Sequence, residues 1–143
     1  MYFKKIYRGI ETKMFLSKAV AAANNSTRKK AYPPAFAFFD TRDFLMDQKL
    51  LLQQALRQAI LHMQMKCKMS LVVHHLICFY EPIMRDQKNS NDRNKGLNMA
   101  ACQMLQRLAQ TLRSSASEDV MSSEYDSTYT TLLEMYRDLE NSM

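Results

Sequence analysis

The spacing of apolar positions along the chain predicts helices joined by polar segments. The longest pattern lies between residues 42 and 80, where apolar side chains recur every three or four residues, as on one helical face. Asp40-Thr41 offers an N-cap pair before it, and Pro82 marks its predicted end. The residues on this face are Leu52, Leu56, Ile60, Met63, Cys67, Leu71, His74 and Cys78.

An unbroken helix over these residues would be longer than a globule of this size allows. It would span about 58 Å, whereas the expected radius of gyration is only about 14–15 Å. The helix therefore either breaks near Met69-Ser70 or projects from the body of the protein. Its second half, from Leu71 to Tyr80, is apolar on more faces than the neighbouring helices can cover. We expect Val73 and Phe79 in this run to contact another chain.

Two further helices are predicted beyond a polar loop at residues 85–96. One runs from about Leu97 to Arg113, and the other follows a serine cluster at residues 114–117. The chain has only two glycines and three prolines, fewer turn residues than sheet proteins usually need. The predicted fold is all-α: an irregular bundle of about four helices with one long central helix. Its predicted core includes Leu56, Ile60, Met63, Leu71, Leu105, Leu108, Leu132 and Leu139.

The first 39 residues are predicted to form a basic arm, attached to a helical domain at residues 40–143. Residues 1–23 have a roughly amphipathic helical pattern, and Pro33-Pro34 then favours extended chain. The phenylalanines that follow are too apolar for a free linker, so we expect the arm to dock across a neighbouring molecule. These phenylalanines are Phe36, Phe38 and Phe39.

Charge is distributed unevenly along the chain. Residues 1–30 hold eight basic groups and one acid, whereas residues 114–143 hold seven acids and one arginine, in a chain of net charge +6. A basic arm fits an acidic protein face, an anionic membrane surface or RNA. Alternatively, it folds back on the acidic segment of its own chain or of a copy. The basic residues expected to bind a partner are Lys4, Lys5, Arg8, Arg28, Lys29 and Lys30.

Candidate catalytic and metal chemistry is sparse. His74 and Cys78 lie four residues apart on a helix and could share an ion. Cys67 lies about 10 Å further along the axis, so a third ligand would have to come from Cys102. There is no glycine-rich phosphate loop and no nucleophile elbow. We therefore expect no metal, no cofactor, no small-molecule substrate and no catalytic residue.

The cysteines and the apolar runs bear on location. Three cysteines without paired spacing favour an intracellular, reducing compartment, and no secretory signal or membrane span is expected. The basic first 30 residues are similar in composition to a mitochondrial presequence. In addition, Ile6-Tyr7-Arg8 resembles the Leu-Tyr-Arg signature of small helical mitochondrial accessory subunits, with isoleucine in place of leucine. That resemblance covers three residues, so a mitochondrial location is kept as an alternative and no family is assigned.

Together these patterns favour a non-enzymatic accessory or structural subunit that binds other protein subunits through helices and the arm. One alternative is a small regulatory or viral accessory protein that binds a host partner through a helix. The other is a peripheral RNA-binding subunit of a ribonucleoprotein, because aromatic rings alternate with basic residues in the arm.

Overall fold

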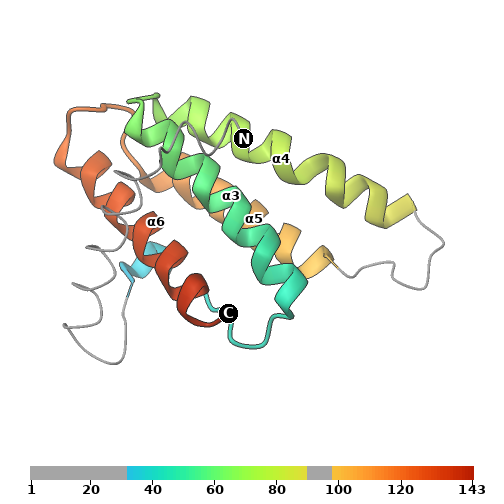
Figure 1. Cartoon of the computed structure of the whole chain (residues 1–143). Coiled ribbons are helices and arrows are strands. Elements are labelled where there is room, and N and C mark those ends of the chain that lie inside the picture. Colours follow the sequence, from blue (N-terminus) through green and yellow to red (C-terminus); the bar gives the residue numbers. More distant parts are fainter. Residues whose placement is uncertain (1–31, 90–97) are drawn as a thin grey trace. The chain divides into compact units, whose positions relative to one another are not determined.

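A computed structural model describes residues 32–89 and 98–143 of the chain. These residues belong to one compact unit, Tyr32–Met143, called the helical unit below. It contains a short 3-10 helix, η1 (Pro34–Phe36), and no strand occurs in the described part, so the all-α class is confirmed (Figure 1). The α-helices are α3 (Met46–Gln64), α4 (Met69–Asn89), α5 (Met99–Ser115) and α6 (Ser123–Asn141). The helix predicted at residues 1–23 lies outside the described residues.

Helix α3 organises the packing of the helical unit. It contacts α4, α5 and α6, and α5 packs in turn against α4 and η1. In Figure 1, α3 runs between α4 and α6. Seven of the eight predicted core residues are buried between these helices, and only Leu71 is exposed. The buried face of α5 includes the small residues Ala101 and Ala109.

The prediction of one long central helix is wrong, because a turn interrupts the helix between α3 and α4. Lys66 has a left-handed backbone with φ of 60°, and two hydrogen bonds close the end of α3. The Lys66 N–H donates to the Met63 carbonyl at 2.9 Å, and the Cys67 N–H donates to the His62 carbonyl at 3.0 Å. This pattern is a Schellman motif, which ends helices. The alternative of a break near Met69-Ser70 is therefore confirmed to within a few residues.

The break also changes which face of the second helix is buried. Residues in the turn do not advance by the helical angle, so α4 starts with a new rotational phase. Leu71, His74 and Cys78, which continue the stripe of α3 in sequence, are consequently exposed. The prediction of Leu71 as a core residue is wrong for this reason. The buried residues of α4 are instead Met69, Val72, Val73, Leu76 and Tyr80.

The first helix of the long pattern begins later than predicted. Asp40 does not cap a helix at residue 42. Its carboxylate instead accepts hydrogen bonds from the Arg42 backbone N–H at 3.2 Å and from the Arg42 guanidinium at 2.7 Å. The helix begins at Met46, where the Leu45 N–H donates to Gln48 Oε1 at 2.8 Å. A glutamine three residues past the cap thus satisfies an amide that has no partner within the helix.

Pro82 does not end its helix, contrary to the prediction. Helix α4 continues to Asn89, so residues 85–89 of the predicted polar loop are helical, while residues 90–97 lie outside the described part. Proline removes one backbone hydrogen bond and disfavours the preceding turn. The packing of α4 against α5 outweighs that penalty. Beyond the proline, Gln87 Oε1 accepts a hydrogen bond from the Asn98 N–H at 3.3 Å, which ties the end of α4 to the start of α5.

The segment before α3 packs on its own chain. Phe36 and Phe39 are buried, and Phe38 lies under the Arg107 guanidinium of α5 at 4.7 Å from the ring centroid. The Tyr32 hydroxyl donates to the Asp138 carboxylate on α6. The expectation that these phenylalanines extend across a neighbouring molecule does not fit Phe36 and Phe39, because both are buried within the described residues.

Candidate functional site

The exposed surface of α3 carries apolar side chains at both ends. Its buried residues occupy one side of the helix, and the opposite side is the surface called here the outer face of α3. Met46 is 51% exposed, Leu50 is 46% exposed and Met65, at the C-terminal end, is 62% exposed. Side chains of this size and exposure on a helix are typical of contact surfaces when they cluster. The positions that define the outer face are Met46, Leu50, Gln54, Arg57, Leu61 and Met65, and the exposed residues Asp47 and Gln58 lie beside them.

Hydrogen bonds from polar side chains of α3 fix the position of this helix on α6. The Arg57 guanidinium donates to the Tyr136 hydroxyl at 2.9 Å and lies 5.9 Å from the centroid of the same ring. About two turns later, Gln64 Nε2 donates to the Tyr129 hydroxyl at 2.9 Å. Because these bridges hold α3 against a packed neighbour, the outer face is presented on a rigid element.

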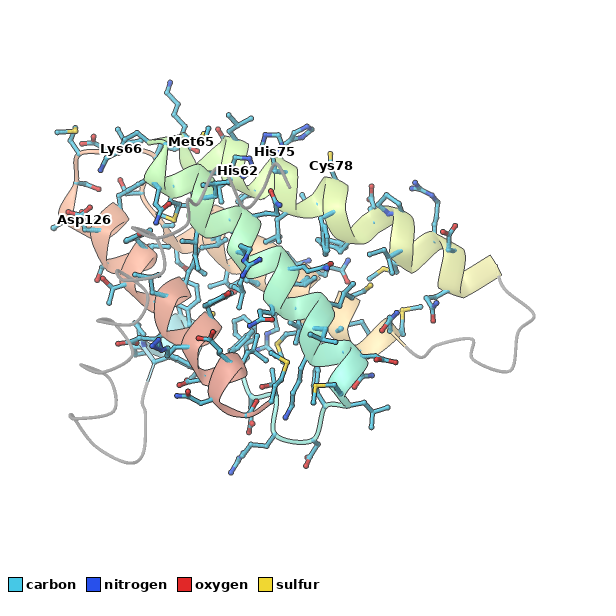
Figure 2. All side chains as sticks on the ribbon, in the orientation of Figure 1. His62, Met65, Lys66, His75, Cys78 and Asp126 are labelled. Carbon is cyan, nitrogen blue, oxygen red and sulfur yellow. The ribbon has the colours of Figure 1, made fainter. Side chains whose placement is uncertain are left out.

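A second exposed apolar group lies around the turn between α3 and α4. The Tyr125 hydroxyl donates to the Cys67 carbonyl at 2.5 Å, and the Lys66 ammonium lies 5.9 Å from the Tyr125 ring centroid. The turn and the first residues of α6 are therefore neighbours, as Figure 2 shows for Lys66 and Asp126. Exposed Met65 belongs to this end of the unit, and so does Met121, which precedes α6.

All three histidines of the chain lie close together, near the end of α3 and the beginning of α4. The rings of His62 on α3 and His75 on α4 are stacked, with centroids 4.3 Å apart and planes 13° apart. His74 lies edge-on to His75 with a centroid distance of 5.7 Å. Its Nε2 is 3.6 Å from the Cys78 sulfur one turn further along. Figure 2 shows His62 and His75 facing each other, with Cys78 farther along α4.

Burial sets the ionisation of several groups in this region. Burial lowers the pKa of His62, and the charge that His75 acquires on protonation lowers it further. The Nδ1 atom of His62 is buried without a hydrogen-bond partner within the described residues. In the core, burial raises the pKa of the Cys102 thiol, so that cysteine is kept neutral and unreactive. Cys78, by contrast, is exposed beside an imidazole.

The candidate metal pair is close in space, and the described residues bring no third ligand to it. His74 and Cys78 approach each other as a shared ion would require, whereas Cys102 is buried on α5. Among the described residues, no group of three histidine, cysteine, aspartate or glutamate side chains could hold a metal ion. Two ligands leave a zinc ion without the protein coordination of structural or catalytic sites. What the described residues bring together here is an exposed thiol beside an imidazole.

The predicted partner-binding residues fall into different environments. Val73, at 2% exposure, is a core residue, so its predicted contact with another chain does not fit its position. Phe79 is half-buried on α4, and Phe38 is half-buried beside α5. Residues outside the described part include Lys4, Lys5, Arg8, Arg28, Lys29 and Lys30.

Sequence reasoning missed the outer face of α3. It assigned one apolar stripe to this helix and treated the rest as its polar side. Met46, Leu50 and Met65 do not belong to that stripe. Their spacing is nevertheless helical and places them along the opposite side, with Met46 and Leu50 near one end and Met65 at the other. A search for a second apolar stripe along the same helix would have found them.

No described helix is long and apolar enough to cross a membrane. In comparisons with known proteins, no protein family, curated protein or solved structure matches the chain.

Proposed function

We propose that this protein is a non-enzymatic accessory subunit of a larger protein assembly, which it joins through exposed helical surfaces. The observation that carries the proposal is the outer face of α3. There, Met46, Leu50 and Met65 expose about half or more of their surface on a helix that hydrogen bonds hold in place. Exposed apolar side chains grouped on a rigid element favour protein–protein contact over a freely solvated surface.

The apolar character of this face favours a protein partner over a nucleic acid. Its middle carries Gln54 and Arg57, and the described residues of the outer face contain no second cation. Nucleic-acid surfaces need several phosphate-binding cations, and residues 1–30 hold eight of the chain's twenty lysines and arginines. A protein surface with its own apolar side chains matches the outer face better. The reducing compartment and the mitochondrial alternative belong to the same proposal and await a localisation experiment.

The mass of the particle that contains the protein in its own cells tests the proposal. The tagged full chain would be isolated under mild conditions, and its particle mass measured by light scattering after size-exclusion chromatography. We expect a particle much heavier than two copies of the chain. A particle of one or two copies would contradict the subunit proposal and favour the small regulatory protein.

Nuclease treatment separates the remaining alternative. The subunit proposal expects the heavy particle to survive nuclease, because protein contacts hold it together. Collapse of the particle after nuclease treatment would promote the peripheral RNA-binding reading in its place. Leu50→Asp should release the chain from the particle, whereas Leu71→Asp, at a similarly exposed leucine on α4, serves as the matched control.

A further inference from the structure

We propose that the outer face of α3 binds the same face of a second copy of this chain, with the two helices antiparallel. This inference rests on the proposed function, since it names an occupant for the surface that carries it. The two-fold axis would pass between Ala55 and Leu56, near the middle of α3. The experiments below distinguish a second copy from another protein bound to the same face.

The first argument is that the outer face has the same pattern in both directions. Its positions are separated by four, four, three, four and four residues, a series that reads identically from either end. The residue types mirror one another as well: methionine stands at both ends, leucine one turn further in from each end, and long polar side chains in the centre. The mirrored pairs are Met46 with Met65, Leu50 with Leu61, and Gln54 with Arg57.

Such a pattern suits a two-fold contact between identical helices. A two-fold interface is isologous: if one residue contacts a second residue in the partner, the second also contacts the first. In an antiparallel pair centred between residues 55 and 56, Leu50 of one copy faces Leu61 of the other, and both methionine pairs lie at the rim. Methionine adapts to irregular gaps, so the rim tolerates some divergence of the helices.

The second argument is charge complementarity. Asp47 is exposed at the N-terminal end of α3, and Lys66 is exposed just past its C-terminal end. An antiparallel pair brings each aspartate near the lysine of the other copy and sets the two helix dipoles in opposite directions. A parallel pair would instead place each aspartate beside the aspartate of the other copy, and each lysine beside the other lysine. The charges therefore favour the antiparallel arrangement.

The central polar residues are compatible with this contact. Gln54 carries an amide carbonyl that can accept from a guanidinium, and it would face Arg57 of the second copy. The Arg57 guanidinium is already held toward α6 by its hydrogen bond to the Tyr136 hydroxyl. This hydrogen bond keeps the two positively charged guanidinium groups apart near the two-fold axis. A helix-to-helix contact of this length lies at the small end of specific interfaces, below about 1,200 Å² in total. We therefore expect a reversible dimer with a dissociation constant on the order of micromolar.

Analytical ultracentrifugation of the purified full chain over a range of concentrations tests the dimer. The wild type should shift from monomer to dimer as concentration rises, and Leu50→Asp should weaken association by at least about tenfold. Leu71→Asp makes the same chemical change at an exposed leucine of α4 and should leave association unchanged. A wild type that stays monomeric at every concentration, or equal losses in both variants, would overturn the inference. Circular dichroism on each variant reports whether it is folded.

Cross-linking between copies tests the orientation without relying on a disruptive variant. In a Cys78→Ser background, Met46→Cys chains would be mixed with Met65→Cys chains and oxidised. The antiparallel pair predicts disulfides between unlike chains, whereas a parallel pair would join like chains, and that result would overturn the proposed geometry. A monomer in isolation that still enters a heavy cellular particle would refute the dimer alone. A dimer in isolation whose cellular particle contains only two copies would refute the subunit proposal alone.

Discussion

At the scale of single residues, the stack of His62 on His75 links a titration to the packing of two helices. The two rings come from α3 and α4 and lie 4.3 Å apart. Burial lowers the pKa of His62. A positive charge on His75 lowers the pKa of His62 further, because it repels a second positive charge on the stacked ring. The sequence shows the three histidines but not this pairing, because His62 and His75 are neighbours only after the chain reverses at Lys66.

This pairing predicts that the protein loses stability as the pH falls. The pKa of His62 is lower in the folded state than its ordinary value of about 6.5, so the unfolded chain binds the proton more readily. The free energy of unfolding should be constant well above about pH 6.5 and should decrease as the pH drops below that value. Urea unfolding at about pH 7.5 and about pH 5.5 measures the difference, since histidine titrates between them.

The variant His62→Gln isolates the source of that pH dependence. It should reduce the loss of stability between the two pH values, because the depressed titration is gone. His74→Gln is the control, since His74 does not stack on His62 and is exposed. An unchanged pH dependence in His62→Gln would contradict the assignment to this residue.

At the scale of elements, the turn between α3 and α4 decides more than where one helix ends. The Schellman motif at His62–Cys67 reverses the chain, and the new phase of α4 sends Leu71, His74 and Cys78 to the surface. The motif normally has glycine in the left-handed position. Here Lys66 occupies it with φ of 60°, which costs roughly 1–2 kcal/mol for a residue with a Cβ.

Replacing this lysine by glycine should therefore stabilise the protein. Lys66→Gly removes the steric cost, and the greater freedom of glycine in the unfolded chain offsets roughly 0.5–1 kcal/mol of the gain. We expect a net increase in the free energy of unfolding of about 0.5–1 kcal/mol, measured by urea titration. Lys66→Ala keeps the Cβ and loses the ammonium near Tyr125, so it should not stabilise. Equal stabilities of the glycine and alanine variants would argue against backbone strain at this position.

At the scale of the whole molecule, the helical unit depends on leucines at the contacts of α3, α5 and α6. Leu56 and Leu108 have no exposed surface, whereas Leu71 remains 42% exposed. All three were predicted to be core residues from the same kind of pattern. Their different positions make them a matched set for measuring how much of the stability comes from burial.

Truncation of these leucines should separate the core from the surface. Leu56→Ala and Leu108→Ala should each lower the free energy of unfolding by about 2–5 kcal/mol, because each removes buried methyl groups and leaves a cavity. Leu71→Ala should change it by no more than about 0.5 kcal/mol. Thermal and urea unfolding of the three variants provides the comparison. A large loss in Leu71→Ala would mean that another surface covers this residue.

The amino-acid sequence by itself determined the helical class, the approximate positions of α5 and α6 and most of the buried leucines. These features follow from local spacing, because residues three and four apart share a helical face wherever the helix lies. The sequence also offered a break near Met69-Ser70 as an alternative to a projecting helix, since an unbroken helix would not fit within a globule of 143 residues.

The orientation of those helices, and the side chains that their surfaces expose, depend on tertiary packing. The left-handed residue Lys66 changed the phase of α4 and put Val73, rather than Leu71, in the core. Packing against α5 carried α4 past Pro82, and Phe36 and Phe39 became buried within their own chain. The packing of other helices on one side of α3 leaves the outer face of this helix exposed. Each outcome depends on contacts between residues distant in sequence, which local periodicity does not contain.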